Sequence, residues 1–196
     1  RGWASEQPRL GGDELESAVR PATFRSIAAP VAAARRMLRL PFPLAGELQV
    51  SLTTSYDPQN IFAQIIRGDA PCYKLYEDDD VLAFLDLFPQ SFGHTLVIPK
   101  RSAACNILDV DTEALAKVMA VVQKLTRVLV DELQPDGVQV AQFNGAPAGQ
   151  TVFHIHVHIV PRYSGEGLGI HAAGKADPAD LEKLQARLQQ RIATQG

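Results

Sequence analysis

One segment of the sequence, residues 151–160, restricts the fold of this chain more than any other. It reads TVFHIHVHIV, so apolar residues alternate with His154, His156 and His158. Because side chains along a β-strand point alternately to its two faces, the pattern predicts a strand over 151–160 with an apolar face and a face of imidazoles about 6.6 Å apart. Burying three of the chain's five histidines together costs free energy of desolvation. The pattern therefore indicates a functional site.

Three interpretations of this histidine segment compete. The first is a surface strand whose imidazoles have ordinary partners. The second is a metal site, because neutral imidazoles two residues apart on a strand can share a zinc ion; the third ligand would come from elsewhere, and His94 is the candidate. The third is nucleophilic catalysis, in which one neutral imidazole attacks phosphorus while its neighbours stabilise phosphoryl oxygens and protonate the leaving group. We favour the third, because neither cysteine nor acid accompanies the histidines.

The loop before this strand suits the binding of a phosphate. Residues 144–150 read NGAPAGQ, and their glycines allow backbone N–H groups to approach an anion. Asn144, Gln150 and Thr151 add side chains that can form hydrogen bonds. We therefore expect this loop beside the reacting phosphorus.

The rest of the sequence predicts an α+β fold, because strands and helices are mixed without a repeating βαβ alternation. Apolar residues at spacings of three and four predict helices over 60–67, 111–134 and 181–192. Of these, the helix that follows the good N-cap Asp111 is the clearest. Short apolar or alternating runs predict further strands over 72–77, 81–87, 94–99 and 138–143.

Composition argues against several classes of function. With 19 Lys and Arg against 22 Asp and Glu, the chain lacks the basic balance of a domain that binds nucleic acid. No apolar run approaches the roughly 20 residues that span a bilayer. Cys72 and Cys105 form no CxxC pair, which suits a reducing compartment such as the cytoplasm. We expect neither nucleic acid nor a membrane as a partner.

We expect the chain to consist of three parts. Residues 1–54 include five arginines and no acid between positions 20 and 40, so we expect a disordered N-terminal extension or, alternatively, a mitochondrial transit peptide. Residues 55–165 form the expected catalytic domain. Residues 166–196 form a C-terminal segment with a helix.

Around its histidines the sequence resembles the histidine-triad (HIT) family, in particular its bacterial Hint-like branch. The family signature is His-x-His-x-His followed by two apolar residues, which here are Ile159 and Val160. The resemblance covers about residues 58–165 and includes IFAQIIRG at 61–68, AFLD at 83–86, GHTLVIPK at 93–100, AGQTV at 148–152 and PRY at 161–163. It implies a five-stranded antiparallel meander crossed by the long helix, and a homodimer in which two such sheets join.

The resemblance also implies roles for individual residues. His156 is expected to be the nucleophile that forms a nucleotidyl-imidazole intermediate, and His158 is expected to face the leaving atom. His154, with His94 nearby, would order the site, and Asp86 would accept the ribose hydroxyls. The apolar clamp around a purine base would consist of Phe62, Ile65, Phe84 and Leu87. The groups near the α-phosphate would be Asn144, Gly149, Gln150 and Thr151.

The activity that the resemblance implies is hydrolysis of nucleoside phosphoramidates or related nucleotidyl conjugates to a nucleoside monophosphate. Dinucleoside polyphosphate hydrolysis remains open, because the AGQT run suits both hydrolase branches. A nucleotide-binding adaptor with incidental catalysis is the alternative from a different class. His158 stands where the galactose-1-phosphate uridylyltransferase branch has glutamine, which favours hydrolysis. Many bacterial members bind a structural zinc through a Cys-x-x-Cys, but Asn60 and Ala63 stand in those places. We therefore expect no zinc and no required cofactor.

Overall fold

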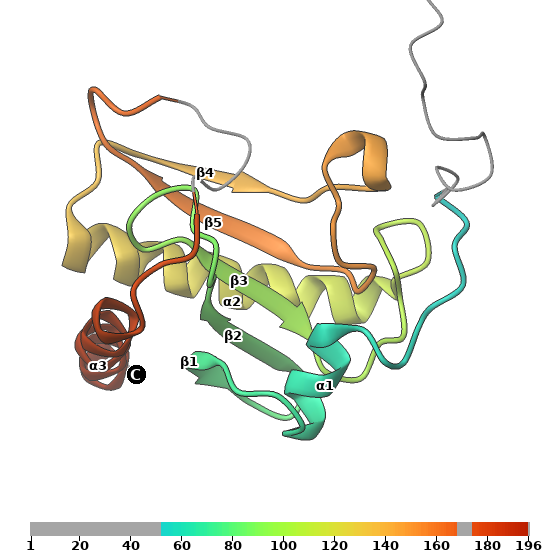
Figure 1. The fold of residues 1–196 in the computed structure, drawn as a ribbon. Helices are drawn as coiled ribbons and strands as arrows, with labels where there is room; N and C mark the ends of the chain where they lie inside the picture. Colours follow the sequence, from blue (N-terminus) through green and yellow to red (C-terminus); the bar gives the residue numbers. More distant parts are fainter. Residues whose placement is uncertain (1–51, 168–173, 196) are drawn as a thin grey trace, which may run out of the picture. The chain divides into compact units, whose positions relative to one another are not determined.

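The structure is a computed structural model that describes residues 52–167 and 174–195 of the chain (Figure 1). All of these residues belong to one of the two units into which the chain divides, residues 44–196. In chain order the elements are α1 (Ile61–Arg67), β1 (Tyr73–Glu77), β2 (Val81–Leu85), β3 (Thr95–Pro99), α2 (Thr112–Leu133), β4 (Gly137–Ala141), the short 3₁₀ helix η1 (Ala146–Ala148), β5 (Val157–Arg162) and α3 (Pro178–Gln195). This arrangement confirms the predicted α+β class.

The five strands form one antiparallel sheet in the order β1-β2-β3-β5-β4. The first three strands follow one another as a meander, in which Leu85 of β2 pairs with Thr95 of β3. The chain then passes through α2 to the outer strand β4, so β5 fits between β3 and β4. His158 of β5 consequently has a strand on each side, with Leu96 of β3 and Ala141 of β4 as its partners.

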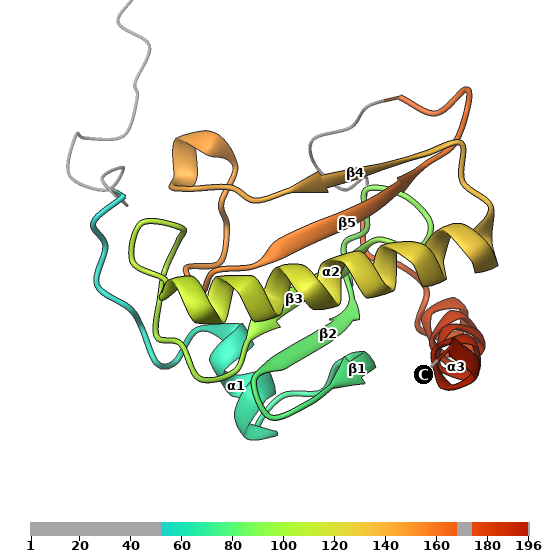
Figure 2. The ribbon, with the colours of Figure 1, turned by 180° about the vertical axis from the view of Figure 1, so that it is seen from behind.

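Helix α2 covers one face of the sheet, as Figure 2 shows. It begins after Asp111, whose carboxylate accepts hydrogen bonds from two backbone N–H groups, and it ends at Gln134 in the left-handed conformation. Its buried side chains recur every three or four residues and are Val118, Val121, Val122, Leu125, Val128 and Leu129. They pack against sheet residues that include Val81, Ala83, Leu85, Val97, Val157 and Ile159.

The opposite face of the sheet carries α1 and a second apolar cluster. This cluster consists of Phe62 from α1, Leu82 and Phe84 from β2, and Leu96 and Ile98 from β3. Successive residues of β2 and β3 point to opposite faces, so one set faces α2 and the other faces α1. Three members of this cluster, Phe62, Phe84 and Leu96, line the cavity described below.

Helix α3 lies along β1 at one edge of the sheet. Its buried leucines, Leu181, Leu184 and Leu188, join the core beneath α2. The side-chain amides of Gln185 and Gln189 donate hydrogen bonds to the carbonyl of Lys74 in β1, at 2.9 and 2.7 Å. The helix thereby supplies partners for a backbone group of the edge strand.

The predicted strand over 151–160 is wrong in its first half, because β5 begins only at Val157. The backbone before it has other partners: the amide of Ile155 donates to the carbonyl of Ala104. The carbonyl of His154 accepts from the ring of His156. Within β5, Val157 and Ile159 face the core under α2, as the alternation predicts. The ring centroids of His156 and His158 are 4.8 Å apart, which is closer than the spacing of about 6.6 Å predicted for imidazoles along one strand. The other predicted elements are confirmed to within three residues at each end.

Residues 1–51 lie outside the described residues, so the expected N-terminal extension and its boundary at residue 55 stay predictions. The carbonyl of Leu52 accepts a hydrogen bond from the side-chain amide of Asn106 at 2.9 Å. The carbonyl of Thr54 accepts one from the thiol of Cys105 at 3.2 Å. Contacts with the domain therefore begin before Ser55. Among the described residues, no helix is long and apolar enough to cross a membrane.

Candidate active site

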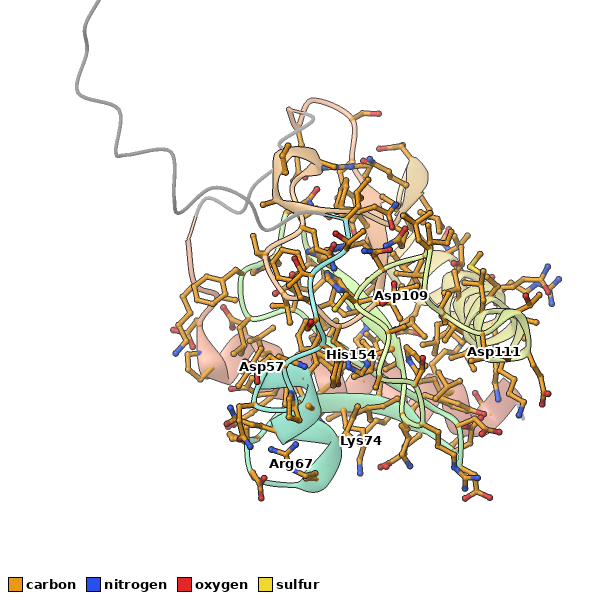
Figure 3. The ribbon with its side chains drawn as sticks, turned by 90° about the vertical axis from the view of Figure 1, so that its right-hand side faces the viewer. Asp57, Arg67, Lys74, Asp109, Asp111 and His154 are labelled. Atoms are coloured by element: carbon orange, nitrogen blue, oxygen red, sulfur yellow. The ribbon has the colours of Figure 1, made fainter. Side chains whose placement is uncertain are left out.

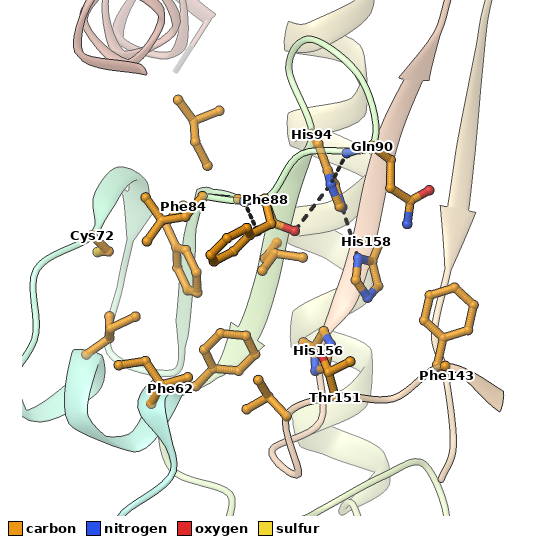
Figure 4. A pocket seen from close by; sticks show the side chains of 18 of the residues that line it. Phe62, Cys72, Phe84, Phe88, Gln90, His94, Phe143, Thr151, His156 and His158 are labelled. Atoms are coloured by element: carbon orange, nitrogen blue, oxygen red, sulfur yellow. Dashed lines mark hydrogen bonds and ion pairs between the residues drawn. The ribbon is translucent and has the colours of Figure 1, made fainter. Parts of the chain in front are cut away.

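A cavity of about 430 Å³ lies between α1, β2 and the histidine segment (Figure 4). Its wall includes His156 and His158 beside four phenylalanines, Phe62, Phe84, Phe88 and Phe143. A mainly apolar wall with a few converging polar groups is typical of a site for a small molecule. The cavity is therefore the candidate active site.

The predicted base clamp comes together on one side of this cavity. Phe62 and Phe84 meet edge to face with ring centroids 5.5 Å apart, and Ile65 and Leu87 line the same wall. The ring of Phe62 also lies 5.1 Å from the ring of His156. A flat apolar ligand bound in the clamp would therefore sit next to the imidazole expected to react.

Asp86 follows β2 and lines the cavity, as expected for a group that binds ribose. Its Oδ1 accepts a hydrogen bond from the backbone N–H of Phe88 at 2.9 Å, which fixes the carboxylate. Its Oδ2 lies 3.3 Å from Nδ1 of His94. The carboxylate can thus accept hydroxyl hydrogens and can also stabilise a charged imidazole at His94.

The ring of His156 is held in one tautomer. Its Nδ1 lies 2.7 Å from the carbonyl oxygen of His154. A carbonyl can only accept, so Nδ1 carries the hydrogen and Nε2 carries the lone pair. The ring is buried, and burial lowers its pKa, which favours the neutral form. A neutral imidazole with its lone pair on Nε2 at a cavity wall has the chemistry of a nucleophile.

His158 is bonded to a second imidazole, that of His94. Nδ1 of His158 lies 2.9 Å from Nε2 of His94, while Nδ1 of His94 accepts from the backbone N–H of Gln90 at 3.1 Å. A backbone N–H can only donate, so Nδ1 of His94 carries the lone pair, Nε2 of His94 donates to His158, and Nε2 of His158 carries a hydrogen. Burial lowers the pKa of His94 to about 4 and that of His158 to about 3.

His158 therefore presents an N–H donor beside the nucleophile. Its Nε2 is buried and has no hydrogen-bond partner among the described residues. A buried donor without a partner costs free energy unless a ligand supplies an acceptor. The arrangement suits an oxygen or nitrogen of a bound substrate.

His154 is not among the residues that line the cavity. Its ring Nε2 lies 2.9 Å from the carbonyl of Pro99, and its Nδ1 lies 2.7 Å from the hydroxyl of Tyr56. The predicted neighbour of this ring, His94, bonds to His158 instead. His154 reaches the site through its backbone carbonyl, which holds His156.

The predicted phosphate-side residues divide into two groups. Gly149 and Thr151 line the cavity; Gly149 has a φ of 99°, which favours glycine. Asn144 and Gln150 do not line it. The side chain of Asn144 accepts from the backbone N–H of Ile107, and that of Gln150 bonds to backbone groups of Gly145, Cys105 and Val152. Both side chains hold the loop in shape.

Three backbone amides of this loop form hydrogen bonds within the loop itself. Those of Ala148, Gly149 and Gln150 donate to carbonyls of Gly145 and Ala146 within the loop. The expectation that the glycines free these amides for a phosphate is therefore wrong for those three. Next to this loop the cavity wall consists of Gly149, Thr151, Val152, His156 and His158.

Sequence reasoning missed several residues of the wall. Phe88 and Cys72 lie on the clamp side, while Gln90 and Phe143 lie near His158 (Figure 4). The ring of Phe143 meets that of His158 edge-on, with centroids 5.1 Å apart. These residues stand in or beside loops, where no periodicity in the sequence indicates which way a side chain points.

The residues do not fit the zinc that the resemblance associates with Cys-x-x-Cys. Ala63 offers no ligand atom, and the side chain of Asn60 caps α1. Among the described residues, Asp86, His94 and His158 form the one group of three potential ligands, with the relevant atoms within 4.8 Å of one another. The two histidines in this group bond to each other, so a metal there would compete with that contact.

Comparison with known proteins agrees with the geometry. The family model described as HIT domain matches residues 67–165. The chain is 42% identical over 138 residues to "Protein hit" of Bacillus subtilis, covering 68% of this chain and 94% of that protein. It is 35% identical over 128 residues to the adenylylsulfatase HINT3 of Arabidopsis thaliana, covering 65% of this chain and 64% of that protein.

Solved structures give the same result. A Hit-like protein of Bartonella henselae, described as involved in cell-cycle regulation and as holding an unknown ligand, superposes with a TM-score of 0.66 at 43% identity, covering 70% of this chain and 99% of that one. A zinc-bound histidine-triad protein of Mycobacterium smegmatis superposes with a TM-score of 0.62 at 38% identity, covering 70% and 95%.

Proposed function

This chain belongs to the histidine-triad (HIT) family, and we propose that it hydrolyses nucleoside phosphoramidates or related nucleotidyl conjugates through a nucleotidyl-histidine intermediate. One observation carries the proposal: Nδ1 of His156 bonds to a backbone carbonyl, which leaves the Nε2 lone pair at the wall of a cavity with an apolar clamp. A base in the clamp and a ribose on Asp86 would bring the α-phosphorus to that nitrogen. The product is a nucleoside monophosphate.

In the first step, Nε2 of His156 forms a bond to the α-phosphorus, and the bond from phosphorus to the leaving nitrogen or oxygen breaks. The leaving atom takes a proton from the His94–His158 pair. In the second step, water attacks the phosphorus, the bond to Nε2 breaks, and a proton of the water returns to the pair. The pair must be charged before the first step, and an anionic substrate beside it favours that charge by raising the imidazole pKa.

Three substrate classes differ only in the leaving group. The proposal names the phosphoramidates; the runner-up is a dinucleoside polyphosphate hydrolase. The adenylylsulfatase relative adds a sulfate leaving group to the comparison. A nucleotide-binding adaptor with incidental catalysis is the alternative from a different class.

A second copy of the chain is the partner that we propose. Helix α3 lies along the β1 edge of the sheet, whereas no described strand pairs with the outer side of β4. Val140 of β4 is 45% exposed, and Met119 and Val130 of α2 are similarly exposed. An apolar edge strand of this kind favours pairing with another chain. Light scattering should give the mass of a dimer, and Val140→Lys should lower it to that of a monomer.

A substrate panel tests the proposed activity. An adenosine 5′-phosphoramidate, a diadenosine polyphosphate and adenylyl sulfate are each incubated with the protein, and release of the monophosphate is measured, with the His156→Ala variant as control. Fastest release from the phosphoramidate supports the proposal, and fastest release from the dinucleotide supports the runner-up. Tight binding by calorimetry without turnover of any compound would overturn the enzyme assignment in favour of the adaptor.

A further inference from the structure

His154 supplies the carbonyl that orients His156, so the position of His154 decides whether the nucleophile is aligned. Its side chain is almost fully buried. In Figure 3 it lies beneath the segment that leads from residue 52 into α1. A backbone carbonyl keeps its orientation only if its own residue is fixed. The contacts of the His154 ring therefore affect the orientation of His156, although the ring is not part of the cavity wall.

Both nitrogens of the His154 ring have partners. Nε2 lies 2.9 Å from the carbonyl oxygen of Pro99 at the end of β3, so it carries the hydrogen and donates. Nδ1 then carries the lone pair and accepts from the hydroxyl of Tyr56 at 2.7 Å. The Tyr56 ring also contacts that of His154, with centroids 5.6 Å apart. The two hydrogen bonds fix both the tautomer and the orientation of the ring.

The residues just before Tyr56 contact the loop that leads to α2. The carbonyls of Leu52 and Thr54 accept hydrogen bonds from Asn106 and Cys105, two residues of the loop that leads to α2. The same loop is joined to the histidine segment, because the amide of Ile155 donates to the carbonyl of Ala104. The segment before Tyr56 and the histidine segment therefore contact the same loop, and the Tyr56 hydroxyl bonds to His154 between them.

We propose that Tyr56 is a positioning residue for the nucleophile: its hydroxyl locks the ring of His154, and the carbonyl of His154 in turn holds Nδ1 of His156. The inference rests on the proposed role of His156. Tyr56 is not among the residues that line the cavity, and its hydroxyl bonds to His154, so we expect it to act through His154. The competing explanation is that Tyr56 contributes to stability alone.

Tyr56→Phe tests the proposal, because it removes the hydroxyl and keeps the ring. We expect kcat to fall about tenfold with KM unchanged, because the free energy of one hydrogen bond, if it is lost from the transition state, corresponds to roughly that factor in rate. The hydroxyl stabilises the neutral form of His154, so its loss should also raise the pKa of that ring. Tyr76→Phe is the matched control: its hydroxyl bonds to Asp78, and kcat should not change.

A second measurement does not depend on activity. Nitrogen-15 NMR of the histidine rings in the unliganded protein reports which nitrogen carries hydrogen. In Tyr56→Phe the signals of both His154 and His156 should shift, whereas in Tyr76→Phe neither should. If the wild type turns over no nucleotide conjugate, the proposed function fails, and the NMR result still decides whether Tyr56 positions His156. A variant with a lower melting temperature but unchanged kcat and unchanged His156 signals would overturn the inference.

Discussion

Nε2 of His94 lies 2.9 Å from Nδ1 of His158, and the two rings stack at an interplanar angle of 28°. Nδ1 of His94 lies between a donor, the backbone N–H of Gln90 at 3.1 Å, and an acceptor, Oδ2 of Asp86 at 3.3 Å. The Gln90 bond suits the neutral pair, and the Asp86 contact suits a pair that has gained a proton. Two coupled imidazoles with a carboxylate nearby can therefore take up and release a proton together.

Replacement of His156 by alanine should abolish turnover and leave the fold intact. No other described imidazole has Nδ1 bonded to the preceding backbone in this way, and loss of a covalent nucleophile costs about three orders of magnitude or more in rate. Turnover is measured by monophosphate release, and the fold by circular dichroism. A variant that kept more than about a tenth of wild-type activity would require a different nucleophile.

Replacement of Asp86 by alanine should raise KM about tenfold with little change in kcat. A ribose contact is made equally in the ground state and in the transition state, so its loss weakens binding without slowing chemistry. Steady-state kinetics on one substrate separate the two parameters. A large fall in kcat at saturation would instead assign Asp86 to the His94–His158 pair, which its Oδ2 approaches.

The sequence predicted the fold and the clamp better than it predicted the loops of the site. Phe62 and Phe84 lie on a helix and a strand, where periodicity determines the direction of a side chain. Thr151 to His156 lie outside any strand, because their backbone bonds to the loop before α2 and to a histidine ring. Such tertiary partners are invisible to an alternation rule.

Lowering the pH from 7 to 5 should destabilise the protein. Burial lowers the pKa values of His94 and His154 to about 4 and that of His158 to about 3, while an unfolded histidine titrates near 6.5. Between these values the unfolded state binds more protons, so each such histidine lowers the free energy of unfolding as the pH falls. The stabilising contribution is complete above pH 6.5 and is lost as the pH falls toward the folded values.

Urea unfolding at pH 7, 6 and 5 measures this loss. The carboxyl groups whose pKa values are lowered, such as Glu77 and Asp78, titrate below this interval, so they contribute little there. A free energy of unfolding that stayed constant from pH 7 to pH 5 would mean that these histidines already carry protons in the folded protein.

The protein should need no metal for turnover. Asn60 and Ala63 do not provide a zinc site, and the proposed steps use imidazoles alone. Dialysis against a chelator should leave kcat unchanged. Added zinc should inhibit, because Asp86, His94 and His158 could bind it only by breaking the contact between the two rings. Stoichiometric zinc by elemental analysis, with activity lost on chelation and restored by the metal, would favour a metal site over nucleophilic catalysis without metal.

Residues 1–54 should be dispensable for catalysis, although the last of them should contribute to stability. The carbonyl of Leu52 bonds to the side chain of Asn106, which is only 1% exposed. A chain that starts at Ser55 loses this acceptor, and a buried amide without its partner costs about 1–3 kcal/mol. We therefore expect the shortened chain to keep the kcat of the full chain and to unfold at a lower temperature.

Two controls separate these effects. A chain that starts at Leu52 keeps both carbonyl contacts and should match the full chain in kcat and in melting temperature. Asn106→Ala in the full chain removes the donor instead of the acceptor, and should lower the melting temperature without changing kcat. If the chain that starts at Ser55 were inactive while folded, the segment before Tyr56 would be needed to place the hydroxyl that bonds to His154.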